Sequence, residues 1–188
     1  MTELVVQAQN IQVFCEERCW RFCFIGGLAV QHWGEQRFTK DVDMSLLTGF
    51  GGEETFIDAL LERYQPRFPE ARSFALQNRV LLLKSPDGVP FDVSLGAIPF
   101  EEEVVQRSVK VPYTDTICLR ICTAEDLIVF KAFACREIDW HDVKSVIIRQ
   151  KNEINWDYIW AQLTPLAEIK EDEQILKKLK GYKNAISE

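Results

Sequence analysis

The apolar run Phe22–Ile25 ends at two glycines, Gly26 and Gly27, and this junction constrains the fold more than any other feature. Such a run, bounded by a glycine pair, is typical of a short buried strand that enters a tight turn. The segment 28–33 then predicts a short helix directly after the glycines. Backbone N–H groups at such a helix N-terminus can approach phosphate oxygens, although a glycine pair alone is equally typical of an ordinary turn.

The segment 40–47 predicts a second strand that carries two acids on one face. Side chains alternate across a strand, so Asp41 and Asp43 point the same way while Val42 enters the core. Two neighbouring carboxylates repel each other unless a cation or a proton lies between them. Oxygen ligands of this kind suit Mg²⁺, which takes further ligands from water and substrate phosphates. Alone, such a pair is also common as a solvated strand face.

A third acid, Asp92, interrupts an apolar strand later in the chain. The segments 79–84 and 89–95 predict a hairpin that turns at residues 85–88. An acid within such a strand is costly unless it has a partner. Three carboxylates on adjacent strands can hold two metal ions about 4 Å apart, which activates an attacking hydroxyl and stabilises a leaving pyrophosphate.

The order of the expected elements divides the chain into an α/β part and a helical part. Residues 4–18 and 53–64 predict helices around the strands, and Thr123 predicts the N-cap of a helix that runs to about Cys135. Further helices are expected over 139–150, after Asn155 and over 171–182. We therefore expect an α/β core at residues 1–115 and a helical C-terminal region at residues 116–188 that packs on it.

The bulk composition is that of an ordinary globular protein. The chain has 188 residues, 47% hydrophobic and 27% charged, with a net charge of −7. This acidity argues against a surface that coats long nucleic acids, but it does not exclude a local basic groove. We find no secretory signal and no apolar stretch that could span a membrane, so we expect a cytoplasmic protein whose six cysteines are free thiols.

The order of the motifs resembles the nucleotidyltransferase superfamily. Gly26 and Gly27 are followed by a spacer of thirteen residues and then by the Asp-Val-Asp-Met segment 41–44. In that superfamily a glycine pair, or Gly-Ser, precedes an acid–apolar–acid–apolar motif, and Asp92 between Phe91 and Val93 is similar to its third-acid motif. The resemblance implies an α/β fold in which a short mixed β-sheet is flanked by helices and followed by a C-terminal helical bundle.

A second likeness is to the abortive-infection, toxin-like nucleotidyltransferases of the AbiEii type. The segment 37–43 resembles their Arg-x-Thr/Ser-x-Asp-x-Asp variant, and Lys131 followed by Arg136, Asp139 and Asp142 resembles their helical pattern. Lys131 lies in an apolar helix, so its ammonium group either reaches solvent or meets an anion. We expect contact with a triphosphate or a catalytic acid, and an ion network among Arg136, Asp139 and Asp142.

The resemblance implies transfer of a nucleoside monophosphate from a nucleoside triphosphate to a hydroxyl, with two Mg²⁺ ions, or Mn²⁺, as cofactors. The acceptor stays open between an RNA end, such as a tRNA 3′ terminus, and a protein hydroxyl; a cognate toxin or antitoxin is a candidate partner. A catalytically silent nucleotide-binding module is the alternative from another class. The implied residues are Asp41, Asp43, Asp92 and Lys131 for catalysis, the same three aspartates for metal, and Gly26, Gly27, Arg37, Thr39 and Lys40 for the nucleotide.

Overall fold

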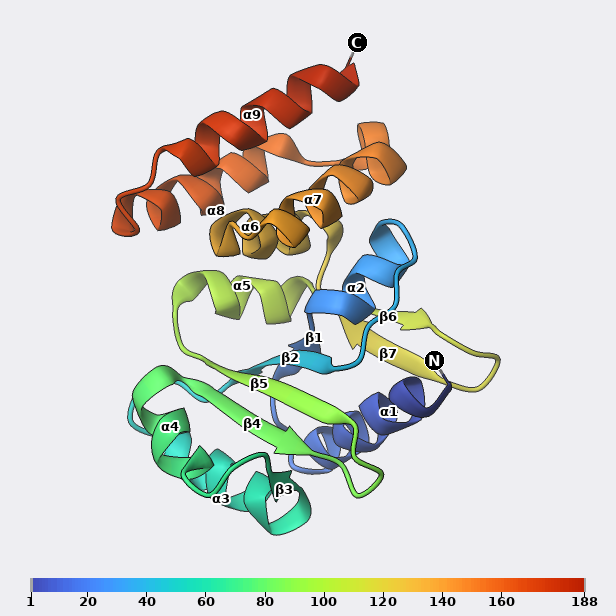
Figure 1. Ribbon diagram of the computed structural model, residues 1–188, viewed down its shortest axis with the longest axis vertical. Coiled ribbons are helices and arrows are strands. Elements are labelled where there is room, and N and C mark those ends of the chain that lie inside the picture. The colour runs from blue at the N-terminus through green and yellow to red at the C-terminus, as the bar shows by residue number, and fades with distance from the viewer. Residues whose placement is uncertain (1, 188) are drawn as a thin grey trace. The chain divides into compact units, whose positions relative to one another are not determined.

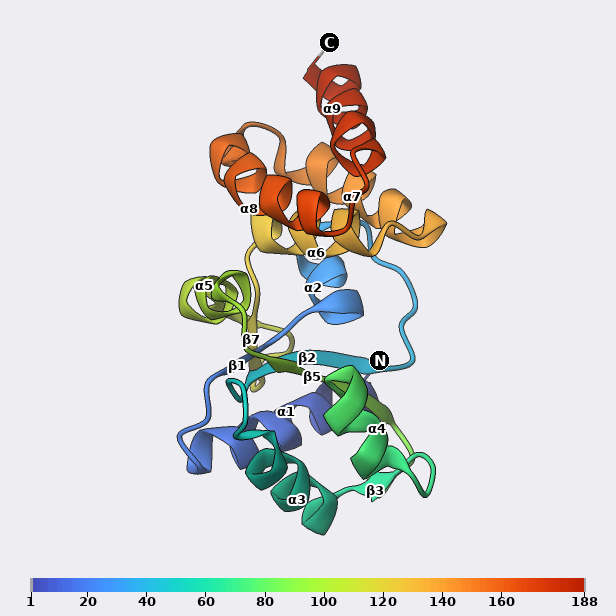
Figure 2. The ribbon, with the colours of Figure 1, turned by 90° about the vertical axis from the view of Figure 1, so that its left-hand side faces the viewer.

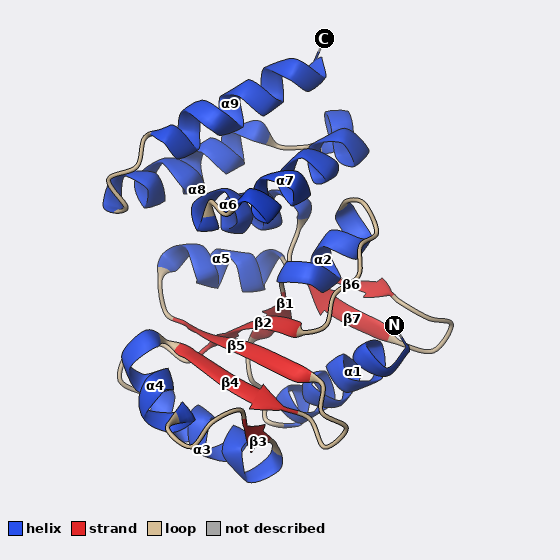
Figure 3. Cartoon of the chain, in the orientation of Figure 1, coloured by secondary structure: helices blue, strands red, loops and turns tan. Residues whose placement is uncertain are grey.

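The computed structural model describes residues 2–187, and the chain divides into two compact units. The sheet unit comprises Met1–Leu28 and Phe38–Cys122, and the helical unit comprises Ala29–Arg37 and Thr123–Glu188. The first carries every strand of the described chain, whereas the second is built from helices (Figure 3). The chain is therefore a mixed α/β protein, as its sequence predicts.

A seven-stranded mixed sheet forms the centre of the sheet unit, in the order β3-β4-β5-β2-β1-β7-β6. The central strand β2 pairs parallel with β5 and antiparallel with β1. The hairpin expected near residues 79–95 is confirmed as the antiparallel pair of β4 and β5. The strands are β1 (Phe22–Phe24), β2 (Val42–Leu47), β3 (Gln65–Pro66), β4 (Val80–Lys84), β5 (Pro90–Gly96), β6 (Val109–Pro112) and β7 (Cys118–Ile121).

Helices cover both faces of this sheet (Figures 1 and 2). The helices α1 (Thr2–Glu17), α3 (Glu53–Arg63) and α4 (Ala71–Asn78) lie on one face, and α5 (Pro99–Arg107) lies on the other. Because side chains alternate along β2, Val42, Met44 and Leu46 are fully buried on the face away from α5. The intervening positions, which include Asp43, face the same side as α5. The hydrophobic core of this unit thus leaves one sheet face available for polar residues.

The helical unit contains α6 (Ala124–Ala134), α7 (Glu137–Gln150), α8 (Trp156–Ile169) and α9 (Gln174–Ser187), with a short 3₁₀ turn at Lys151–Glu153. The α6 helix packs against α7 and α8, and α9 packs against both of them as well. Thr123 and Asn155 accept hydrogen bonds from the backbone N–H groups of Asp126 and Tyr158, which confirms both expected N-caps. Among the described helices, none has the length and apolar character required to cross a membrane.

Candidate active site

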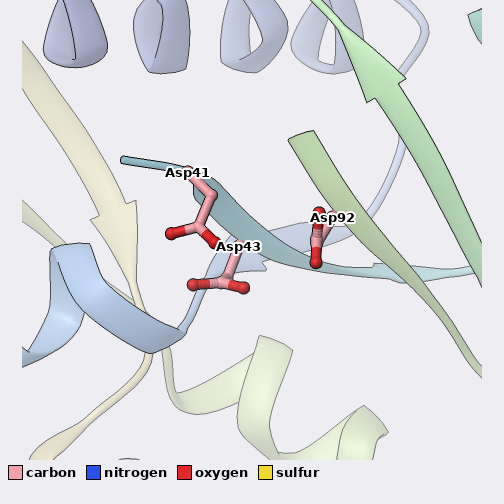
Figure 4. A group of neighbouring side chains, drawn as sticks. All are labelled: Asp41, Asp43 and Asp92. Carbon is pink, nitrogen blue, oxygen red and sulfur yellow. The ribbon is translucent and has the colours of Figure 1, made fainter. Parts of the chain in front are cut away.

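Three aspartates meet on one face of the sheet. Asp43 on β2 lies directly opposite Asp92 on the parallel strand β5, and Asp41 immediately precedes β2. One carboxylate oxygen from each residue lies within 4.8 Å of the other two. Figure 4 shows the three side chains projecting from these neighbouring strands to the same side of the sheet. All three are partly exposed, so the cluster is open to ligands from solvent.

The glycine turn lies against this cluster. The side chains of Asp43 and Thr39 fill the space that a Cβ atom would need at Gly26 and Gly27. Helix α2 (Gly26–Trp33) begins directly at the glycines, and Gly26 has a left-handed φ of +58°. A Cβ atom on Gly26 would collide with the Asp43 carboxylate, and one on Gly27 would collide with the Thr39 side chain. The Gly27 N–H group instead donates to Asp43 Oδ2 at 3.3 Å. Gly26 is therefore needed for Asp43 to approach the turn, and Gly27 is needed for Thr39 to do so.

Thr39 orders the first acid of the cluster. Its hydroxyl donates to Asp41 Oδ1 at 3.0 Å, so the residue fixes the carboxylate that comes just before β2. Lys40, between the two residues, is exposed. The hydrogen bond to Asp41 gives Thr39 a role in ordering the strand that carries the acids. Phosphate binding by Thr39 and Lys40 stays a prediction.

Arg67 is a functional candidate that the sequence analysis missed. It lies in the connection between β3 and α4, and its Nη2 atom lies 2.6 Å from Asp92 Oδ1. Burial raises the pKa of Asp92; the Arg67 guanidinium works against that shift, and the neighbouring Asp41 carboxylate adds to it. No motif marks Arg67, because its sequence neighbours give no indication that the loop returns to the third acid.

The composition of this cluster fits a divalent metal ion. Each of the three carboxylates offers an oxygen atom, and these atoms are close enough to share one ion or a pair of ions. Oxygen-only ligands with partial solvent exposure suit Mg²⁺ or Mn²⁺ better than zinc, which favours sulfur and nitrogen. The residues predicted as metal ligands are thus brought together by the fold.

Lys131 lies in the helical unit and pairs with two buried aspartates. Its Nζ atom lies 3.0 Å from both Asp139 Oδ1 and Asp142 Oδ2, and its side chain is 9% exposed. Arg136 also pairs with Asp139, at 2.6 Å, so the predicted network of Arg136, Asp139 and Asp142 exists. The anions that Lys131 meets in the structure are these carboxylates. Its contact with a triphosphate or a catalytic acid remains a prediction.

Arg37 completes this network from the segment that precedes Thr39. Its Nε and Nη2 atoms bind the two oxygens of Asp142 at 2.8 and 3.0 Å, a bidentate geometry that fixes orientation. Two residues of α7 reinforce the contact, because Arg149 donates to the Gly34 carbonyl and Gln150 donates to the Trp33 carbonyl, both at 2.7 Å. The residues before Thr39 are therefore anchored to α7, and nucleotide binding by Arg37 stays a prediction.

The mixed α/β sheet, with three acids beside a glycine turn, fits the class of enzymes that transfer nucleotidyl groups. The chain belongs to the family described as nucleotidyltransferase of unknown function (DUF6036), whose model matches residues 3–186. This match confirms the nucleotidyltransferase resemblance. No curated protein sequence matches the chain.

Several solved structures show a distant likeness. An antigenic nucleotidyltransferase-like protein from Paracoccidioides brasiliensis is 15% identical, with a TM-score of 0.48 over 95% of this chain and 91% of that chain. The lincosamide antibiotic adenylyltransferase LnuA is 13% identical, with a TM-score of 0.49 over 73% and 92%. The ANT(2")-Ia complex with adenylyl-2"-tobramycin is 14% identical, with a TM-score of 0.48 over 98% and 99%. Likeness at this level gives no information about the substrate of this chain.

Proposed function

We propose that this protein transfers a nucleoside monophosphate from a nucleoside triphosphate to a hydroxyl acceptor, in a reaction that depends on a divalent metal ion. The observation that carries the proposal is the meeting of Asp41, Asp43 and Asp92 beside the Gly26–Gly27 turn. Family membership supports the type of chemistry. Arg67 offsets part of the charge of Asp92, and a bound cation would offset the repulsion that remains among the three carboxylates.

The aspartates have distinct roles in this proposal. Asp41 and Asp43 would hold both metal ions, and Asp92 would complete the site for the ion on the acceptor side. The metal, when bound, lowers the charge on the phosphates and the pKa of the attacking hydroxyl. The hydroxyl oxygen forms a bond to the α-phosphorus, the bond from that phosphorus to the β-phosphate oxygen breaks, and pyrophosphate leaves. Asp92 would help to remove the hydroxyl proton.

The glycine turn supplies the other half of the site. Backbone N–H groups at the start of α2 can donate to triphosphate oxygens, and the helix N-terminus adds a favourable partial charge. Thr39 and Lys40 would add a hydroxyl and an ammonium group on the neighbouring segment. Lys131 and Arg37 keep their predicted contribution to the nucleotide site, but their ion pairs favour a positioning role for both residues.

For the acceptor we favour an RNA end, such as a tRNA 3′ terminus. The support is the likeness of residues 37–43, and of the Lys131 to Asp142 pattern, to the toxin-like AbiEii type. The same likeness makes a cognate antitoxin a proposed partner, and the cytoplasm the proposed location. A protein hydroxyl is the competing acceptor, and the experiment below separates the two.

The test is to incubate the protein and a cell extract with each α-labelled nucleoside triphosphate in Mg²⁺, and then to separate RNA from protein. We expect labelled RNA from one or more triphosphates, and no label with the Asp43→Asn variant. Label in protein alone would replace the RNA acceptor with a protein. If the wild type labels nothing while triphosphates raise its melting temperature in Mg²⁺, the protein is a silent binding module and the proposal is wrong.

A further inference from the structure

The helical unit has two cavities whose lining is basic although the whole protein is acidic: one lies at the end of α7 and the 3₁₀ turn beside α8 and α9, and the other is lined by α8 and α9. One cavity, of about 520 Å³, is lined by Lys151, Trp156 and Lys183 together with apolar residues and one asparagine. The other, of about 380 Å³, is lined by Trp160, Lys177, Lys180 and Lys183. The cavities share Lys183, so they form one continuous surface, here called the lysine–tryptophan surface. The two helices lie side by side in Figure 1.

This surface is strongly basic in an acidic protein. Four lysines line the two cavities, and none of the described lining residues is acidic. The net charge of the chain is −7, so this concentration of positive charge is a local departure from the rest of the sequence. The segment of α9 from Gln174 to Ser187 contains no Asp or Glu, although Lys177 pairs with Glu173, just before the helix, at 3.7 Å. A basic groove of this kind attracts a negatively charged polymer even when the protein as a whole is acidic.

Each cavity is lined by one member of a pair of stacked tryptophans. Trp156 and Trp160 lie one helical turn apart on α8, with ring centroids 5.9 Å apart and ring planes 25° from parallel. Lys183 lies over the Trp156 ring, 5.1 Å from its centroid. Both rings are only partly buried. Tryptophans in ordinary packing are expected to be covered by apolar side chains, whereas these two form the walls of lysine-lined cavities.

We propose that the lysine–tryptophan surface binds single-stranded RNA. Trp156 already stacks on Trp160 and lies under Lys183, so Trp160 is the ring offered to a base, while the flanking lysines would neutralise phosphates. Stacking is possible only with unpaired bases, so the surface should prefer a single strand to a duplex. An acidic protein segment could pair with the lysines, but it would offer no base to stack on Trp160.

This surface would explain how an acidic enzyme holds a polyanionic acceptor. Its role in docking the acceptor rests on the proposed transfer reaction, whereas RNA binding by the surface does not. The two claims can therefore fail separately. If the protein binds RNA but transfers no label, the RNA-binding proposal stands and the transfer proposal is wrong. If it labels RNA without binding through this surface, the transfer proposal stands and the RNA-binding proposal is wrong.

The experiment measures binding in EDTA, without nucleoside triphosphate, so that the metal site and the transfer reaction play no part. A short fluorescein-labelled oligoribonucleotide of mixed sequence is titrated with the full chain, and anisotropy reports the affinity. The same strand in a duplex and a polyglutamate of equal length are the comparison ligands. We expect the single strand to bind most tightly and to quench tryptophan fluorescence.

Two variants locate the binding surface. Trp160→Leu should weaken binding of the single strand roughly five-fold or more, as expected for the loss of one stacking platform. The double variant Lys177→Gln and Lys180→Gln should lower the slope of log affinity against log salt by about 1.4, which corresponds to two lost phosphate contacts on a single strand. Both lysines are exposed, so their removal should leave the melting temperature unchanged.

The matched control removes two lysines elsewhere, Lys84→Gln and Lys144→Gln, both of which are exposed in the wild type. This control should bind RNA like the wild type apart from a small effect of net charge. An equal loss in the control and in the Lys177/Lys180 variant would overturn the assignment to this surface. Equal binding of polyglutamate would identify an acidic protein as the partner, and equal binding of the duplex, or no binding at all, would contradict the proposal directly.

Discussion

The protein contains two clusters of aspartates that are opposite in design. In the sheet unit, Asp41, Asp43 and Asp92 are partly exposed and close to one another. In the helical unit, Asp139 and Asp142 are 0% and 1% exposed, and each forms ion pairs with two basic residues. The first cluster gathers negative charge where solvent can reach it. In the second, the negative charge is paired with Lys131, Arg37 and Arg136.

This difference distinguishes aspartates that can bind a ligand from aspartates that stabilise the fold. A buried carboxylate without compensation destabilises a protein strongly, so Asp139 and Asp142 need the basic residues around them. The partly exposed acids keep their water and tolerate one another at a lower cost, which leaves their oxygens available for metal. Substitutions in the two clusters should therefore have opposite consequences for activity and for stability.

The largest expected effect is on activity. Asp43→Asn should reduce nucleotidyl transfer by more than the roughly 10- to 100-fold that loss of an outer partner of a metal site costs. Its melting temperature should stay the same or rise, because one of three repelling charges is gone. Asp139→Asn should do the reverse and melt earlier, while transfer persists at temperatures where it is folded. Labelled transfer assays and thermal melts of both variants test this, and equal loss of stability in both would break the contrast between the clusters.

The next effect is on stability. Lys131→Met removes the cation shared by Asp139 and Asp142 but leaves Arg136 and Arg37 in place, so the free energy of unfolding should fall by about 1.5–3 kcal/mol. Urea denaturation measures this loss. The exposed Lys144→Met on α7 is the matched control and should change stability little. Full stability of the Lys131 variant together with a loss of transfer would show that the ammonium acts on the nucleotide instead.

A smaller effect is expected at the pair of Arg67 and Asp92, where an acid of the first cluster has a basic partner like the acids of the second. A guanidinium on the third acid competes with a metal ion, so Arg67→Gln should bind Mn²⁺ roughly two- to five-fold more tightly, in keeping with a partly exposed pair. Arg72→Gln, which removes an exposed arginine paired with Asp58, is the control. Unchanged or weaker Mn²⁺ binding by the Arg67 variant would assign Arg67 to orienting Asp92.

The smallest effect concerns pH. Burial acts to raise the pKa of Asp139, but hydrogen bonds from Arg136 and Lys131 outweigh it and hold the pKa below its ordinary value. The stability that this lowered pKa provides is complete above the unfolded value of about 3.9 and is lost as pH falls through the folded value. The stability difference between wild type and Asp139→Asn should therefore stay constant from about pH 6 to pH 5 and shrink from there toward pH 3. Thermal melts across this range measure it, and a constant difference would contradict the account.

Much of the site could be predicted from the sequence because its signals are local. Strand alternation places Asp41 and Asp43 on one face, and it places Asp92 opposite its apolar neighbours. The structure adds that Asp43 and Asp92 are direct partners in the register of β2 and β5. The Gly26–Gly27 turn was also visible in sequence, but its close approach to Asp43 and Thr39 was not.

What could not be predicted depends on contacts between distant segments. Arg67 meets Asp92 only because β3 and β4 bring its loop back to β5, and nothing in the sequence around Arg67 indicates this return. Helix α4 was missed because its buried positions, Ala71 and Ala75, are small and give a weak apolar periodicity. The sequence indicated an anion for Lys131 but could not distinguish a substrate phosphate from the carboxylates of α7.

The most direct test of the central claim is a count of bound metal. Mn²⁺ titrated into the full chain without nucleoside triphosphate can be followed by electron paramagnetic resonance, which distinguishes free ion from ion bound to the protein. We predict that the wild type binds Mn²⁺, that Asp43→Asn weakens this binding by more than roughly 100-fold, and that the matched surface variant Asp58→Asn leaves it unchanged. Equal Mn²⁺ binding by the wild type and Asp43→Asn would contradict the assignment of the three aspartates as the metal site.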